Sequence, residues 1–316
     1  MPTLDCSTQS QAVANTMPHF IIIGAMKSAT STLHVQLSRQ LGFWMSEPKE
    51  PNFFSDDDVW TKGLGWYSAL FEGAAPSDLR GESSTHYTKL PDYPEALARM
   101  REHVPDAKLI YIMRHPIDRL VSHYMHAWLE ASMEGDINQA VERYPALVNY
   151  GRYTMQLQPF LETYGPDNVL PVFFERLTKH PQEELERVCA FLGYEGVPIW
   201  SEEESRQNVS TERLRVDPLR DRIVNYPPIK FVRQKMIPRS VRNRVKQAWQ
   251  ITEKPELSLP VRRALMATFD QDLQTLGEWL GADLDCLTFK EAVRAKPLNW
   301  TKAAPFQDQW TLSPAT

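Results

Sequence analysis

The sequence has few cysteines and no long apolar run. Cys6, Cys189 and Cys286 are the only cysteines among 316 residues, and their wide spacing matches neither a zinc site nor a disulfide framework. The chain contains no stretch of about 18 consecutive apolar residues, and its first residues lack the basic start and apolar run of a signal peptide. We therefore expect a cytoplasmic protein in a reducing compartment, without a transmembrane segment.

Excess positive charge is also lacking. The formal net charge is −5 and the isoelectric point is near 5.9, whereas domains that bind nucleic acid through their overall field are usually basic. A nucleic-acid partner is therefore not expected, and any anion site must be local. With 42% hydrophobic and 24% charged residues, the chain has the composition of a globular protein with a sizeable core. Nothing in the sequence indicates an oligomeric state.

Strand and helix patterns alternate along the chain. An apolar run ends at Gly24, and a helix is expected after it from the stripe Leu33, Leu37 and Leu41, with Thr30 or Ser31 as the N-cap. Buried strands are also predicted at 108–113 and 169–174, with helices after each and a long amphipathic helix over 261–280. Alternating strands and helices favour an α/β fold, a single P-loop-like domain whose mainly parallel sheet of about five strands is flanked by helices, with a helical C-terminal region.

The domain limits follow from changes in composition. Residues 1–17 are polar and aperiodic and are expected to form a flexible N-terminus, before a domain spanning 18–290. Within that domain, 201–257 is richer in proline, arginine and polar residues and is expected to be a loop or helical insertion that caps the donor or acceptor. Residues 291–316 are expected to form a loop-like C-terminal tail.

The segment GAMKSATST, residues 24–32, joins the first strand to its helix. Unpaired amides and the positive end of the dipole at a helix N-terminus favour an anion, and Lys27 adds a full charge. Thr30, Ser31 and Thr32 add hydroxyl donors. The segment therefore predicts a phosphate cradle.

A nucleoside triphosphatase or P-loop kinase is the first alternative. Its loop requires GxxxxGK[ST], with the lysine directly before the hydroxyl residue that binds magnesium, but here the lysine follows the glycine by three positions. The strand at 108–113 is followed by Arg114, where such enzymes usually place a magnesium-binding aspartate. A phosphate donor that needs no metal fits better, and a non-catalytic nucleotide-binding protein of the same fold is the second alternative.

At this loop the sequence resembles the family of sulfotransferases that use 3′-phosphoadenosine 5′-phosphosulfate (PAPS). The family pattern K-[ST]-[GA]-T-[ST] directly follows the first strand and binds the 5′-phosphosulfate. The resemblance implies that PAPS is the co-substrate, that 3′-phosphoadenosine 5′-phosphate (PAP) is the product, and that no metal takes part. The matching residues are Lys27, Ser28, Ala29, Thr30 and Ser31.

A second motif, YIMRHPIDRLVSHY at 111–124, strengthens the resemblance. An arginine ends a strand and a serine follows eight positions later, about two helical turns away. In the family this pattern binds the 3′-phosphate. The resemblance therefore assigns that contact to Arg114 and Ser122, with the guanidinium supplying a forked, charge-assisted interaction.

Further segments resemble the heparan-sulfate-type branch of the family and its bacterial relatives. They are PKEPNFFS at 48–55, GLGWY at 63–67, GESSTHY at 81–87 and FFERL at 173–177. The resemblance spans roughly 18–290. It implies transfer of a sulfuryl group to a hydroxyl or amine of an acceptor, a carbohydrate or another small metabolite, and leaves the acceptor's identity open.

The resemblance also suggests the catalytic groups. Lys27 would stabilise the departing phosphate, and Glu50, at the position of the branch's catalytic glutamate, would be the base, with a pKa moved to a useful value by burial. His86 is the alternative base, because cytosolic sulfotransferases use a histidine on a comparable strand. Ser83 departs from the branch, which commonly has a lysine there, so a second catalytic cation is in doubt.

The polar region after residue 200 offers further candidates for ligand contacts. QNVSTERLR, residues 207–215, corresponds to the loop that often closes the nucleotide site in the family, which makes Asn208, Arg213 and Arg215 weaker candidates for donor contacts. A basic stretch from Lys230 to Lys246 suits an anionic polysaccharide, a membrane surface or simply solvent.

Overall fold

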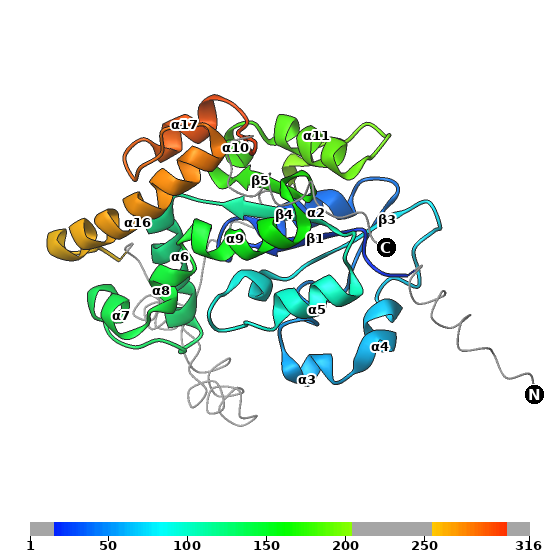
Figure 1. The fold of residues 1–316 in the computed structure, drawn as a ribbon, viewed down its shortest axis with the longest axis horizontal. Helices are drawn as coiled ribbons and strands as arrows, with labels where there is room; N and C mark the ends of the chain where they lie inside the picture. Colours follow the sequence, from blue (N-terminus) through cyan, green and yellow to red (C-terminus); the bar gives the residue numbers. More distant parts are fainter. Residues whose placement is uncertain (1–15, 204–254, 302–316) are drawn as a thin grey trace, which may run out of the picture.

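A computed structural model describes residues 16–203 and 255–301. Its strands form one parallel sheet in the order β2-β3-β1-β4-β5 (Figure 1). The α/β fold with a five-stranded parallel sheet, flanking helices and C-terminal helices is thereby confirmed. The strands are β1 (Phe20–Gly24), β2 (Phe43–Met45), β3 (Leu79–Ser83), β4 (Lys108–Met113) and β5 (Val169–Phe173).

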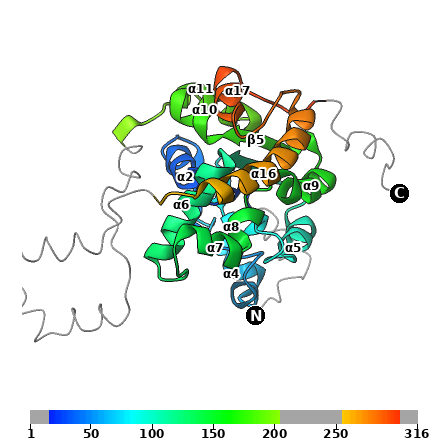
Figure 2. The same ribbon diagram turned by 90° about the vertical axis from the view of Figure 1, so that its left-hand side faces the viewer.

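Both faces of the sheet are covered, which explains why β1, β4 and β5 are mainly apolar without alternation. Ile21 and Ile23 pack into one hydrophobic cluster, whereas Phe20 and Ile22 pack into the other. The second cluster is formed with α2 (Thr30–Ser38) and α11 (Pro181–Leu192), and the first with α5 (Ala96–His103), α6 (Pro116–Leu129), α9 (Tyr153–Tyr164) and α16 (Leu259–Leu280) (Figure 2).

Shorter helices connect these layers. None of the helices in the described residues is both long and apolar enough to cross a membrane. The shorter elements are α3 (Asp57–Trp60), α4 (Gly63–Ala69), η1 (Thr85–Thr88), α7 (Ile137–Arg143), α8 (Ala146–Asn149), η2 (Pro166–Asn168), α10 (Phe174–Lys179) and α17 (Phe289–Ala295).

Some local predictions were wrong. Helix α2 ends at Ser38, and Leu41 is 89% exposed, because the chain turns there toward β2 instead of extending the helix. The N-cap of α2 is Ala29, in a left-handed conformation and without a side-chain cap, so neither Thr30 nor Ser31 takes that role. Helix α17 crosses residue 290 and buries Val293 completely, so this part of the expected tail is not loop-like.

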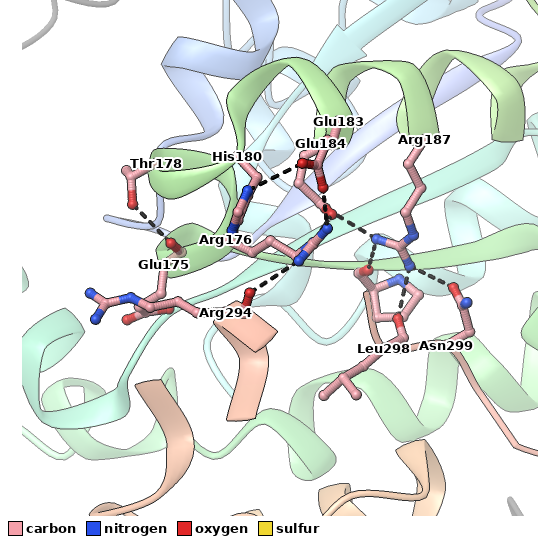
Figure 3. A network of polar contacts seen from close by, with 11 residues as sticks. Glu175, Arg176, Thr178, His180, Glu183, Glu184, Arg187, Arg294, Leu298 and Asn299 are labelled. Atoms are coloured by element: carbon pink, nitrogen blue, oxygen red, sulfur yellow. Dashed lines mark hydrogen bonds and ion pairs between the residues drawn. The ribbon is translucent and has the colours of Figure 1, made fainter. Parts of the chain in front are cut away.

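A polar network fixes the helices that follow β5 (Figure 3). Arg176, on α10, is 5% exposed, and its guanidinium donates to Glu184 of α11 at 2.7 Å and to the Arg294 carbonyl of α17 at 3.1 Å. Arg187, on α11, donates to the Leu298 carbonyl at 2.8 Å. A buried guanidinium with charged and carbonyl partners is strongly directional. The network therefore holds α10 firmly at the end of β5.

Gly24 leaves no room for a side chain where β1 meets the following loop. A Cβ built there would lie 2.2 Å from Thr88 Oγ1 and 2.7 Å from Tyr111 Cε2. We expect Gly24→Ala to lower the free energy of unfolding by about 1–3 kcal/mol, as other overpacked substitutions do. The shift of the urea midpoint at constant m measures this loss.

Gly65 is the matched control, because it lies inside α4 and a Cβ there would meet nothing within 4 Å. Replacing a helical glycine by alanine at such a position adds roughly 0.5–1 kcal/mol. A Gly24→Ala protein as stable as the wild type would contradict the close packing described for this loop.

Candidate active site

A cavity of about 870 Å³ lies at the carboxyl ends of the strands. Its lining includes residues that follow four of them: Lys27 after β1, Thr85 after β3, Arg114 after β4 and Phe174 after β5. In parallel α/β sheets this edge is where ligands bind. The cavity also contains Glu50, so both predicted phosphate motifs and the predicted base line one space.

The first phosphate motif forms a tight loop between β1 and α2. Lys27 and Ala29 have φ angles of 69° and 70°, so the backbone is left-handed at both positions. Helix geometry leaves the amides of Thr30, Ser31 and Thr32 without carbonyl partners inside α2, and the first turn carries no acidic residue. These three residues line the cavity together with Lys27 and Ala29. The loop therefore has the features of an anion-binding site.

Ser28 differs from the rest of the motif. It is fully buried, it does not line the cavity, and its hydroxyl has no hydrogen-bond partner among the described residues. Its amide donates to the Ala25 carbonyl at 3.2 Å. The structure thus gives no contact between the Ser28 side chain and the cavity, although the motif match had included it.

Arg114 connects the two phosphate motifs. Its guanidinium donates to the Lys27 carbonyl at 3.1 Å and lies over the Phe174 ring, 4.4 Å from the centroid. The Tyr153 hydroxyl donates to the Arg114 carbonyl at 2.5 Å, which fixes the backbone. The buried Nε of Arg114 has no partner among the described residues. A cationic fork is therefore held at the cavity with donor capacity left for a ligand.

Ser122 lies on α6, which begins at Pro116 directly after the arginine. Proline at the first helical position suits this start, and the His115 side chain accepts from the Asp118 amide as the N-cap. The His115 amide donates to the Glu175 carboxylate at 2.8 Å. Ser122 is half-buried and lines the same cavity as Arg114, as the eight-residue spacing predicts.

Glu50 is held in place by several partners. Lys49 Nζ lies 2.5 Å from Glu50 Oε1, and the Thr85 hydroxyl donates to Oε2 at 3.2 Å. Burial alone would raise the pKa of Glu50, but the charges of Lys49 and Lys89 and the two hydrogen bonds outweigh it and lower this pKa below its usual 4.5. The expectation that burial would set the pKa of Glu50 was therefore wrong, because the charge of Lys49, its neighbour in the sequence, and that of Lys89, which only the fold brings near, act in the opposite direction.

The alternative base, His86, also lines the cavity. Its Nδ1 lies 2.9 Å from Asp56 Oδ1, and its ring stacks on Tyr93 at 4.5 Å. Burial and the charge of Lys89 lower its pKa below the usual 6.5, although Asp56 opposes the shift. Because a carboxylate only accepts, the neutral ring has its proton on Nδ1 and leaves Nε2 as the acceptor.

The GESSTHY segment, residues 81–87, makes buried hydrogen bonds next to the site. Glu82 is completely buried and accepts from the hydroxyls of Tyr67 at 2.6 Å, Tyr87 at 2.8 Å and Ser84 at 2.6 Å. Ser84 in turn accepts from the Asn52 amide at 3.0 Å, beside Glu50. Glu82 and Tyr87 therefore position the loop that carries the proposed base.

Ser83 is also fully buried, and its hydroxyl is 2.9 Å from His34 Nδ1. It does not line the cavity.

Several cavity residues were not among the sequence candidates. Thr85 and Phe174 belonged to segments that were noted, but Lys89 follows its segment without any motif, and Trp200 and Glu202 reach the cavity only through the fold. No spacing rule indicates such residues before the chain is folded. The weaker donor candidates Asn208, Arg213 and Arg215 and the basic stretch at 230–246 lie outside the described residues.

Comparison with known proteins finds similarity to sulfotransferases in sequence and in fold. The profile of a family described as "Sulfotransferase family" matches residues 52–198, which contain Arg114 and Ser122 but not Lys27 or Glu50. A crystal structure of a sulfotransferase from Alicyclobacillus acidocaldarius has the same fold, with a TM-score of 0.61 and 23% identity, and covers 85% of this chain and 97% of its own.

Two mouse (Mus musculus) proteins are among the similar sequences. Heparan sulfate glucosamine 3-O-sulfotransferase 3B1 is 32% identical over 199 residues, which are 58% of this chain and 48% of that protein. Heparan sulfate glucosamine 3-O-sulfotransferase 3A1 is 32% identical over 192 residues, which are 56% of this chain and 46% of that protein. The matches thus span about half the length of these relatives.

Proposed function

We propose that this chain, whose residues 52–198 match the profile of the sulfotransferase family, transfers the sulfuryl group of PAPS to a hydroxyl or amine of an acceptor. The observation that carries this proposal is the junction of the two phosphate motifs. Arg114 donates to the Lys27 carbonyl at 3.1 Å, and both side chains line one cavity of about 870 Å³.

The two motifs divide the donor between them. The 5′-phosphosulfate lies at the start of α2, where Lys27 and the first amides of the helix face an anion. The 3′-phosphate is bound by Arg114 and Ser122. A nucleotide with phosphate at both the 5′ and the 3′ position of the ribose contacts Lys27 and Arg114. A nucleotide that lacks the 3′-phosphate leaves Arg114 without an anion.

The reaction is an in-line transfer between two oxygens, or between an oxygen and a nitrogen. The bond from sulfur to the bridging oxygen breaks, and its electron pair stays on the 5′-phosphate of PAP, where Lys27 stabilises the developing charge. The acceptor atom bonds to sulfur and passes its proton to Glu50. By analogy with the loose transition state of phosphoryl transfer, the acceptor needs little activation, so an ionised carboxylate of lowered pKa suffices as the base.

His86 remains the second candidate for the base, and a specific observation favours it. Its contact with Asp56 orients the ring and leaves Nε2 as an acceptor. The family resemblance supports Glu50, so we propose Glu50 as the base and test the two residues against each other below.

For the acceptor, we propose only a chemical class. The two mouse relatives are named as enzymes that act on heparan sulfate glucosamine, which makes a carbohydrate the first class to examine. Incubation with PAPS labelled in its sulfuryl group and separate panels of sugars, lipids and small alcohols would identify the class that becomes labelled. Labelled sugars would support a carbohydrate acceptor, and label only in lipids or alcohols would contradict it.

Arg114 provides the test of the donor assignment. We expect Arg114→Met to weaken PAP binding by roughly 10-fold to 100-fold, because a hydrogen bond to a charged group contributes about 1.5–3 kcal/mol. Binding of adenosine 5′-phosphate, which lacks the 3′-phosphate, should change little. Calorimetric titration of wild type and variant with both nucleotides measures the difference, and equal losses for the two nucleotides would contradict a 3′-phosphate contact.

A further inference from the structure

Lys89 is a buried lysine in the cavity that the roles above do not use. It follows η1, the residue is 8% exposed, and it lines the cavity together with Lys27, Glu50 and His86. Lysine is rarely buried to this extent unless an anion or several dipoles compensate its charge. Its position next to both candidate bases therefore calls for an explanation.

The backbone around Lys89 is held by many hydrogen bonds. Its carbonyl accepts from the amides of Asp92 at 2.8 Å and Tyr93 at 3.2 Å. The next residue, Leu90, bonds to the buried Gln156 side chain through both its amide, at 2.8 Å, and its carbonyl, at 3.0 Å. The backbone that carries the Lys89 side chain is therefore fixed, so binding a ligand does not have to order this part of the chain, which lowers the entropic cost of binding.

The ammonium group of Lys89 lies 5.8 Å from the centre of the Tyr150 ring and makes no direct ion pair with a described carboxylate. Burial lowers its pKa to about 8, although the charges of Glu50 and Asp56 oppose the shift. A ring face compensates a buried cation only in part. An anionic ligand in the cavity would complete the compensation.

We infer that Lys89 is a second catalytic cation, which contacts the sulfuryl oxygens during transfer on the acceptor side while Lys27 stabilises the departing phosphate. The inference rests on the proposed function. Its geometric basis is that Lys89 shares the cavity with the donor loop and with both candidate bases. Lys89 keeps its proton throughout: the sulfur-to-bridging-oxygen bond breaks, the bond from sulfur to the acceptor forms, and the acceptor proton goes to the base.

The test separates binding from turnover. We expect Lys89→Met to bind PAP, which lacks the sulfuryl group, within about threefold of wild type, and to release PAP from PAPS about 10²-fold more slowly, the loss typical of one transition-state donor. Lys89→Arg should recover part of the rate. Lys62→Met is the matched control, because Lys62 also lies over an aromatic ring, Trp66 at 4.5 Å, but outside the cavity.

The pH profile of kcat/KM for PAPS adds a readout that a merely structural role would not move. In wild type this ratio should fall as the pH rises through about 8, where free Lys89 loses its proton, and the fall should be absent in Lys89→Met. Burial raises the pKa of Tyr93 and Tyr150, and it lowers that of His86 and His123, so these groups do not change charge near this pH. The charged groups around Lys89 are Glu50, Asp56, Asp92, Arg119 and, beside Glu50, Lys49.

Two results would overturn the inference while leaving the proposed function in place. One is a Lys89→Met enzyme whose turnover stays within threefold of wild type. The other is an equal loss of PAP affinity and turnover, which would make Lys89 a donor-binding residue. A wild-type protein that neither binds PAP nor consumes PAPS would instead remove the proposed function and this inference together.

Discussion

Replacing Lys27 by methionine is expected to slow the release of PAP from PAPS by about 10²-fold to 10³-fold, or roughly 2.7–4 kcal/mol of transition-state stabilisation. Lys27 lies in the left-handed turn before α2 and lines the cavity. As the bond to sulfur breaks, charge accumulates on the 5′-phosphate, so the interaction with a nearby ammonium group strengthens toward the transition state. PAP affinity should also fall, because the same phosphate remains in the product.

Lys27→Arg and Lys62→Met are the controls for this result. Arginine keeps the charge but presents it in a wider, planar group, so its rate should lie between wild type and Lys27→Met. Lys62→Met removes a lysine from outside the cavity and should behave as wild type. If Lys27→Met turned over PAPS as fast as the Lys62 variant, the charge of Lys27 would have no part in the reaction.

The second large effect concerns the base. Glu50→Gln should lower turnover by about 10²-fold to 10⁴-fold, the range for loss of a general base, while PAP binding stays close to wild type. The amide keeps the shape of the side chain but cannot take the acceptor's proton. Single-turnover rates with labelled PAPS and the acceptor found by screening, together with calorimetric titration with PAP, measure the two quantities.

His86→Asn is the comparison that decides between the two bases. With Glu50 as the base, the histidine variant should retain turnover within about tenfold, and the wild-type kcat should fall only when the pH drops below the usual carboxyl pKa of 4.5, because the pKa of Glu50 is lowered. Below that pH the carboxylate gains a proton and can no longer accept one. An inactive His86→Asn enzyme beside an active Glu50→Gln enzyme would transfer the role to the imidazole.

The sequence predicted the centre of the fold better than its edges. The central strands were recognised because both faces of a parallel sheet are buried, which leaves runs such as 109–113 of β4 without charged residues. The start of α2 was misjudged because a hydroxyl residue usually caps a helix, whereas here a left-handed Ala29 turns the chain into the cradle. Leu41 continued the apolar stripe but lies beyond the end of the helix.

The site shows a similar division between local and distant information. Short sequence motifs identified Lys27, Arg114 and Ser122, because each motif lies at the junction of one strand and the helix that follows it. The structure brings the three residues to one cavity. The lowered pKa of Glu50 depends partly on Lys89, which is 39 positions away in the sequence and approaches it only through the tertiary structure. Electrostatic surroundings of this kind depend on distances between elements, which residue patterns do not contain.

The central claim is that the cavity binds a nucleotide carrying a 3′-phosphate and serves a sulfuryl donor. The most direct measurement compares the thermal stability and calorimetric binding of wild-type protein with PAP and with ATP plus Mg²⁺. We predict binding of PAP at one site and, at 100 times its Kd, stabilisation by about 2.7 kcal/mol, with a much smaller effect of ATP and Mg²⁺. Stabilisation by ATP with Mg²⁺ and none by PAP would contradict the account and favour a kinase.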